Sequence, residues 1–161
     1  MLHYYKLYWL NAFKIHGRSR RKEFWYPVLV NIIITIIAGI LNSFLPIPKG
    51  LSYTIGIIFS IANYIPSFTV MVRRFHDTGM TMKIPMILYI FMILDDISDV
   101  IPKSNFKFDL NFNNALNITI SIIIIVIVAA FLILCIFSLA VCCTRGNEYS
   151  NKYGANPKYV N

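Results

Sequence analysis

Long apolar stretches without a charged side chain are the feature that most constrains this sequence. Two of them, Phe24–Leu45 and Leu51–Val72, are separated only by a short turn rich in proline. At 1.5 Å per residue, a helix of either length crosses the roughly 30 Å hydrocarbon core of a bilayer. A third stretch, Ala115–Cys143, is the most hydrophobic and is longer than a crossing needs. We therefore predict transmembrane helices over residues 24–45, 51–72 and 115–143.

A fourth apolar stretch is shorter and ends in acidic residues. Its strictly apolar part is Ile84–Leu94, and the run extends to Ile101 only if three aspartates, Asp95, Asp96 and Asp99, lie at the far headgroup level. We predict a fourth transmembrane helix over residues 84–101, with a re-entrant or interfacial helix as the alternative. The aspartates have a spacing that suits a divalent cation, but a solvated helix end explains them more simply. In the following segment, residues 102–114, apolar and polar residues alternate, and we predict a loop on the outer interface, with a docking strand for another protein as the alternative.

The composition supports a membrane environment. Hydrophobic residues make up 57% of the 161 residues and charged residues only 14%, which is too little polar surface for a soluble domain of this size. We predict an all-α fold with residues 1–161 as a single membrane domain, a bundle of four transmembrane helices arranged as two hairpins. The aromatic and basic residues of segment 1–23 predict a short helix at the membrane interface, and residues 144–161 form a polar tail.

The distribution of lysine and arginine predicts the orientation. Of the 15 basic residues, twelve lie in the N-terminal segment, between Arg73 and Lys83, or in the tail, and only Lys49, Lys103 and Lys107 lie on the other side. By the positive-inside rule, both termini are cytoplasmic. The net charge of +8 lies beside the apolar stretches. Phospholipid phosphates are therefore the nearest anions, and nucleic acid is not predicted as a partner.

Two polar residues in or beside the apolar stretches carry local predictions. Ser19 is a candidate N-cap for the first transmembrane helix. Asn63 is expected deep in the second, where an amide most often links neighbouring helices. The alternative role for Asn63 is to line a pore.

The boundary at the end of the second apolar stretch holds the densest group of polar residues. Arg73 and Asp77 are four residues apart, a spacing that allows an ion pair on one helix face, and Gly79 is suited to end the helix in a left-handed conformation. A tied helix end is the structural interpretation. The functional interpretation is a site for phosphate or lipid headgroups, built from the basic and polar residues that share this membrane face: Arg18, Arg20, Arg21, Arg73, Arg74, His76 and Asp77.

Enzymatic chemistry is not predicted. His76 and Asp77 lack an accompanying nucleophile or metal-ligand set, and the three cysteines have no C-x-x-C spacing. The sequence predicts no catalytic residue, no cofactor and no metal. It favours a non-enzymatic membrane component that binds anionic lipid headgroups or an acidic protein partner and that self-associates. The alternative is a subunit of an oligomeric pore or transporter.

Three sequence blocks also resemble a known family. They are FKIHGRSRRKEFW at residues 13–25, Pro66 followed by RRFHDTG at residues 73–79, and NKYGANP at residues 151–157. In this order they resemble the bacterial domain-of-unknown-function family 805, the YhaH-like inner-membrane proteins. The resemblance implies a small multi-pass protein of the bacterial plasma membrane and brings no activity, substrate or catalytic residue with it. One departure is Met80-Thr81-Met82-Lys83, where the family usually has Ser-Gly-Trp-Trp.

Overall fold

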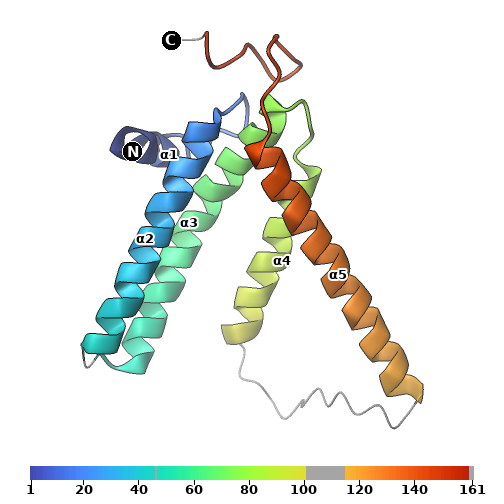
Figure 1. Ribbon diagram of the computed structural model, residues 1–161. Coiled ribbons are helices and arrows are strands. Elements are labelled where there is room, and N and C mark those ends of the chain that lie inside the picture. Colours follow the sequence, from blue (N-terminus) through green and yellow to red (C-terminus); the bar gives the residue numbers. More distant parts are fainter. Residues whose placement is uncertain (46, 101–114, 160–161) are drawn as a thin grey trace. The chain divides into compact units, whose positions relative to one another are not determined.

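The described part of the chain is entirely helical in its regular structure. The computed structural model describes residues 1–45, 47–100 and 115–159, so the predicted outer loop at 102–114 lies outside the described residues. Within them there are five α-helices, coloured along the chain in Figure 1: α1 (Leu2–Leu10), α2 (Arg21–Phe44), α3 (Lys49–Asp77), α4 (Lys83–Val100) and α5 (Ala115–Cys143). The predicted all-α fold is confirmed.

Three of the five helices are long and apolar enough to cross a membrane. Among the described residues these candidate spans are Arg21–Phe44, Gly50–Asp77 and Ile118–Cys143. They correspond to three of the four predicted transmembrane helices. Large side chains such as Ile36 and Phe44 on α2 are exposed, which is expected when lipid rather than protein surrounds them. The predicted fourth helix is present as α4, and its crossing of the membrane stays a prediction.

The chain divides into two compact units. The first comprises Met1–Met82 and Val141–Asn161, and the second comprises Lys83–Ala140. In the second unit, the ring of Phe91 on α4 lies 5.5 Å from the ring of Phe131 on α5, measured between centroids. The first unit contains α1, α2, α3, the last residues of α5 and the tail, and it holds all the predicted site residues.

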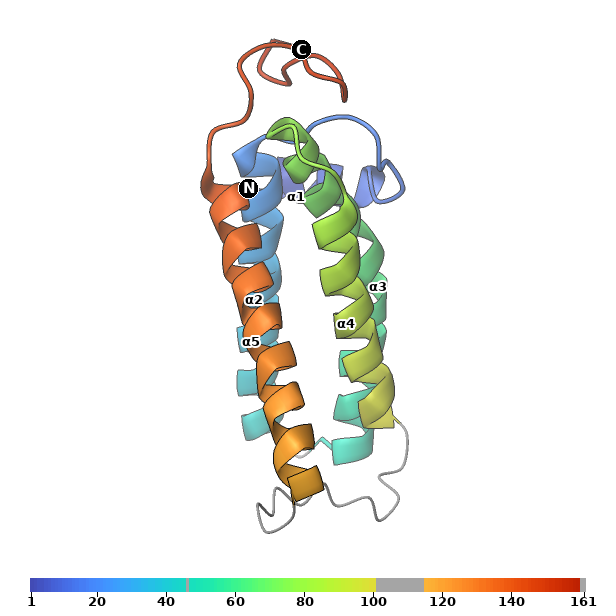
Figure 2. The same ribbon diagram turned by 90° about the vertical axis from the view of Figure 1, so that its right-hand side faces the viewer.

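In the first unit, α2 and α3 form a hairpin, and α1 packs against both. Figures 1 and 2 place α1 near the end of the hairpin where α2 begins and α3 ends. The predicted N-terminal helix over residues 2–13 is thus present, although it ends at Leu10. Its location at a membrane interface stays a prediction.

Polar side chains fasten α1 to the hairpin. The Tyr8 hydroxyl lies 3.1 Å from Oδ1 of Asn63, and the Tyr5 hydroxyl lies 3.1 Å from Oδ1 of Asn31. The two asparagines are linked in turn, because Nδ2 of Asn31 donates to Oδ1 of Asn63 at 3.1 Å. Asn63 therefore makes the interhelical contact that the sequence predicted. Burial among these residues raises the pKa of the Tyr8 hydroxyl from 10.0 to about 12.

The prediction that Ser19 caps α2 is wrong. The N-cap is Arg20, and no side chain makes a capping hydrogen bond there. Ser19 instead belongs to the contact with α3: its backbone N–H donates to the carbonyl of Arg73 at 3.1 Å, and its carbonyl accepts from Nη1 of Arg74 at 3.4 Å. These bonds hold Ser19 in the contact between the two helices, and α2 begins after it.

The prediction that Gly79 ends α3 is confirmed. Thr78 is the C-cap, and Gly79 has a φ of 82°, in the left-handed region. The N–H of Gly79 donates to the His76 carbonyl at 3.0 Å, and that of Met80 donates to the Phe75 carbonyl at 2.9 Å. These two bonds define a Schellman motif. The turn leaves the last residues of α3 facing the tail.

Candidate functional site

Three helix termini of the first unit meet in one place, which we call the basic end. It comprises the first turns of α2, the last turn of α3 and the C-terminus of α5. Nε1 of Trp25 and Nε of Arg74 both donate to the carbonyl of Cys142, each at 3.2 Å. One carbonyl at the end of α5 therefore holds a side chain from α2 and a side chain from α3.

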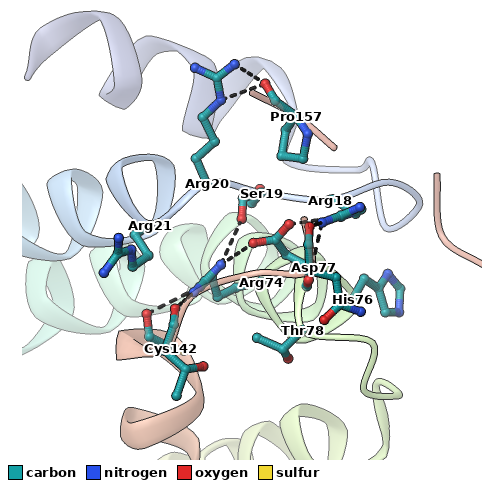
Figure 3. A network of polar contacts seen from close by, with 12 residues as sticks. Arg18, Ser19, Arg20, Arg21, Arg74, His76, Asp77, Thr78, Cys142 and Pro157 are labelled. Atoms are coloured by element: carbon teal, nitrogen blue, oxygen red, sulfur yellow. Dashed lines mark hydrogen bonds and ion pairs between the residues drawn. The ribbon is translucent and has the colours of Figure 1, made fainter. Parts of the chain in front are cut away.

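Asp77 is the centre of the basic end. Nε of Arg18 donates to its Oδ1 at 2.9 Å, and Nη1 of Arg74 donates to its Oδ2. Figure 3 shows the two guanidinium groups converging on this carboxylate from different segments. The Arg18 and Arg74 side chains are each only 1% exposed, and the Asp77 side chain is 7% exposed. Such a buried group of charges is stable only when its members are paired and hydrogen-bonded.

The predicted pairing of Arg73 with Asp77 is wrong. Asp77 pairs with Arg74, three residues earlier, and with the distant Arg18. Nε of Arg73 instead donates to the Thr69 carbonyl within α3, at 3.4 Å. The physical reason is that Arg18 and Arg74 each occupy one oxygen of the carboxylate. Arg73 and Arg74 are both buried, but only Arg74 reaches the carboxylate.

The arginines of the basic end also hold the backbone of the tail. Nη1 of Arg18 donates to the Tyr149 carbonyl at 2.8 Å, and Nε of Arg20 donates to the Pro157 carbonyl at 2.6 Å, as drawn in Figure 3 for Arg20. Nη2 of Arg74 donates to the Thr144 carbonyl. A carbonyl oxygen is a good acceptor for a buried guanidinium because it supplies negative charge without a second desolvated anion.

His76 takes part in the same contact through packing. Its ring stacks on the ring of Tyr153, with centroids 3.7 Å apart and planes 8° from parallel. The side chain of Asn151 donates to the His76 carbonyl at 2.9 Å. The tail from residue 144 to residue 157 is therefore held both by the end of α3 and by the two arginines that precede α2.

Gly146 allows the closest approach between the tail and the site. A Cβ at this position would overlap the Asp77 carboxylate, which two arginines already hold in place. The next residue continues the contact, because the N–H of Asn147 donates to the Asp77 carbonyl at 2.8 Å. Only glycine fits here while the ion pairs persist.

A cavity of about 650 Å³ opens at the basic end, entirely within the first unit. Trp25 and Tyr26 of α2 contribute to its wall, and Asp77 is its one acidic lining residue. Its basic lining residues are Arg20, Arg21, Lys22, Arg74, Arg145 and Lys158. The volume falls within the range of about 300–1,000 Å³ that is typical of small-ligand sites. We refer to it below as the basic cavity.

The structure thus divides the predicted site residues into three groups. Arg20, Arg21, Arg74 and Asp77 line the basic cavity. Arg18 instead lines a neighbouring cavity of about 510 Å³ together with Arg20. Arg73 and His76 line neither of these cavities.

Sequence reasoning missed several contributors to the site. Lys22, Arg145 and Lys158 supply half of the basic lining, and Gly146 supplies the close approach to Asp77. Arg145 and Lys158 lie in the polar tail, which the sequence predicts on the cytoplasmic side without a contact to α2, so their charges gave no sign that they line a cavity with it. The NKYGANP block was the one signal in the tail, and it contains Asn151 and Tyr153, which contact His76.

Comparison with known proteins gives consistent results. Residues 12–155 match the family described as "Protein of unknown function (DUF805)". Inner membrane protein YhaH of Escherichia coli (strain K12) is 32% identical over 102 residues, which cover 59% of this chain and 84% of that protein.

A second relative matches over more of the chain. Inner membrane protein YhaI of the same strain is 24% identical over 143 residues, which cover 89% of this chain and 85% of that protein. No solved structure matches. The matched family segment contains every predicted site residue and most of the tail that contacts them, and the chain belongs to the DUF805 family of uncharacterised bacterial inner-membrane proteins.

Proposed function

We propose that this chain is a non-enzymatic inner-membrane protein of four transmembrane helices whose basic end faces the cytoplasm and engages anionic lipid headgroups. The observation that carries the proposal is the charge of the basic cavity. It has six basic lining residues and one acidic one, at the place where candidate spans begin and end. Anionic headgroups are the most abundant anions at that level of a membrane.

The continuity of α5 supports a fourth crossing. The helix runs unbroken over 29 residues, so its first residue lies about 40 Å from its end at Cys143, along its axis. If α5 crosses the membrane, the start of the helix is at the face opposite the basic end. Because α3 also ends at the basic end, the segment between the two helices has to cross as well. That segment contains α4, whose 18 residues extend about 27 Å, close to the thickness of the hydrocarbon core.

Contacts between the two ends of the chain support placing them on one side. Arg18 and Arg20, which precede α2, bond to carbonyls of the C-terminal tail. Together with the excess of lysine and arginine in these segments, this favours a cytoplasmic location for both termini.

Aromatic side chains support a position at headgroup level. Trp25 and Tyr26 lie in the second turn of α2 and in the wall of the basic cavity. Tryptophan and tyrosine prefer the membrane–water interface, because their rings are amphipathic. An acidic protein partner would satisfy the same charges, but lipid is already adjacent to every transmembrane helix.

The alternative, a pore or transporter subunit, receives less support. Asn63 is the polar residue that would have to line a pathway, and its side chain is bonded to Tyr8 and Asn31 within the packed first unit. These bonds favour a packing role.

Lipid retention tests the proposal. The protein, extracted in a mild detergent from membranes of known composition, is expected to retain anionic phospholipids at a higher ratio to zwitterionic ones than the bulk membrane contains. A ratio equal to that of the bulk would contradict headgroup binding. Co-purification of a stoichiometric acidic protein without lipid enrichment would point to the protein partner instead.

A further inference from the structure

We infer that the basic cavity binds a single phosphate-bearing anion in a defined position, rather than sharing a diffuse layer of headgroups. This inference rests on the proposed function and makes it specific, because it names one site with fixed walls. The same chemistry is offered by the headgroup of an anionic phospholipid and by a soluble phosphate. The surface around the cavity favours the lipid.

The charges of the cavity are only partly satisfied within the protein. Both ion pairs found among the described residues involve Asp77, which is shared by Arg18 and Arg74. Arg20 is occupied by the Pro157 carbonyl. Lys22 and Arg145 are exposed, line the same cavity, and belong to neither ion pair. An anion that enters the cavity therefore meets cations that form no ion pair with a carboxylate of the described residues.

Backbone donors add to this attraction. The cavity lies at the start of α2, where the N–H groups of the first two helical residues have no partner in the preceding turn, whereas that of Glu23 donates to the Arg20 carbonyl at 3.0 Å. The N-cap Arg20 offers no side-chain acceptor to them. Arg21 and Lys22 are the first two residues of the helix and both line the cavity, so cationic side chains and a positive helix end act on the same space. Glu23 is the one acidic side chain in this first turn, so the cations there are only partly compensated without a bound anion.

The surface of α2 that continues from the cavity toward the C-terminus of the helix is suited to acyl chains. Trp25 lines the cavity, and the side chains four, seven, eight and eleven residues later lie on the same helical face. These residues, all apolar and all exposed, are Leu29, Ile32, Ile33 and Ile36. A lipid whose phosphate occupies the cavity would lay its chains along this stripe. A free phosphate would gain nothing from it.

Trp25 provides a probe inside the site. The chain has two tryptophans, Trp9 and Trp25, so Trp9→Phe leaves the cavity residue as the only one. The indole is held by its hydrogen bond to the Cys142 carbonyl. The full-length Trp9→Phe protein is reconstituted in phosphatidylcholine nanodiscs that contain a small fraction of either brominated phosphatidylglycerol or brominated phosphatidylcholine. Quenching of Trp25 by each brominated lipid measures how often that lipid occupies the cavity.

Matched variants separate the cavity from the rest of the basic surface. Lys22→Gln with Arg145→Gln removes two cavity charges, and Lys6→Gln with Lys14→Gln removes two exposed charges that do not line the basic cavity. The expected result is a preference of Trp25 for brominated phosphatidylglycerol that falls by about fivefold for each cavity charge removed and is unchanged by the control pair. In a parallel arm, inorganic phosphate is titrated against the unbrominated sample. A change in Trp25 emission that saturates there, and is lost in the cavity variant, would assign the site to a soluble phosphate.

Two results would overturn the inference. In one, neither brominated phosphatidylglycerol nor inorganic phosphate acts preferentially on Trp25. In the other, the cavity and control variants lose the preference equally. If the purified protein still retains excess anionic lipid in either case, the diffuse headgroup layer of the proposed function is correct and the defined site is not. If the purified protein also retains no excess of anionic lipid, both the defined site and the proposed headgroup binding are wrong.

Discussion

Arg18 and Asp77 are 59 residues apart in the sequence, yet Nε of Arg18 donates to Oδ1 of Asp77 at 2.9 Å with both side chains buried. This pair joins the segment before α2 to the last residue of α3. Arg74 completes the group on the other oxygen of the carboxylate. Because both arginines also bond to tail carbonyls, one acidic residue organises three separate parts of the chain.

Replacing Asp77 tests this organisation. Asp77→Asn keeps the shape of the side chain but leaves the buried guanidinium groups of Arg18 and Arg74 without a counter-charge. We expect the free energy of unfolding to fall by about 3–5 kcal/mol, as is typical when one partner of a buried ion pair is removed. Denaturant titration in detergent micelles measures the change. Glu148→Gln removes an exposed carboxylate of the tail and is the control; an equal, small effect of both variants would show that the buried group is not structural.

Gly146→Ala tests the approach of the tail to the carboxylate. The added methyl group would overlap Asp77, whose two ion pairs prevent it from moving aside. We expect the tail to detach, seen as faster proteolysis between residues 144 and 157, with a loss of stability of about 1–3 kcal/mol. Gly39→Ala in α2 meets nothing within 4 Å and is expected to leave proteolysis unchanged. Unchanged protection in Gly146→Ala would contradict the placement of the tail.

Replacing Asn63 tests how α1 is held. Asn63→Leu keeps the size of the side chain and removes the Oδ1 atom that Tyr8 and Asn31 share, while the backbone carbonyl of residue 63 still accepts from the Tyr8 hydroxyl at 3.3 Å. We expect a loss of about 0.6–2 kcal/mol, the range measured for polar contacts between membrane helices. Amide hydrogen exchange in α1 should increase as it detaches more often. Asn42→Leu, at an exposed position of α2, is the control and should leave α1 protected.

The raised pKa of Tyr8 gives a pH dependence. The hydroxyl titrates near 10 in the unfolded chain and near 12 in the folded protein, because burial disfavours the phenolate. The folded state is therefore unaffected below pH 10 and loses stability as the pH rises from about 10 to about 12. Tyr8→Phe should remove this loss, measured as the difference between the pH–stability curves of the two proteins. Parallel curves across that window would show that Tyr8 is not buried against Asn63.

The fold was largely predictable because lipid imposes simple requirements on a sequence. Uncharged stretches of 22 to 29 residues located α2, α3 and α5 to within a few residues, except that α3 continues through the polar residues to Asp77. Gly79 was predictable as the end of α3, since a left-handed residue followed by a non-helical segment is a local signal. The choice of Ser19 as a cap failed because a tertiary contact with Arg73 overrode the local preference.

The site was only partly predictable, for a different reason. The cluster of arginines predicted a site for anionic groups. In the structure, the partners of these arginines are mainly backbone carbonyls of the tail. A backbone carbonyl is present in every residue, so the sequence does not show which ones will accept these bonds. The spacing of Arg73 and Asp77 suggested a pair on local geometry alone. Arg18 approaches from a distant segment and takes one oxygen of the carboxylate, which the local spacing does not reveal.

The orientation of the chain in the membrane is the most direct test of the proposed function. A basic end that faces the cytoplasm requires four crossings that return both termini to the cytoplasm. Reporter fusions at Asn161 and ahead of Met1 are expected to be active only in the cytoplasm. Fusions at Lys49, where α3 begins, and at Lys103 are expected to be active only outside it. A cytoplasmic reporter at Lys49, or an external one at Asn161, would contradict the proposed arrangement of the membrane spans.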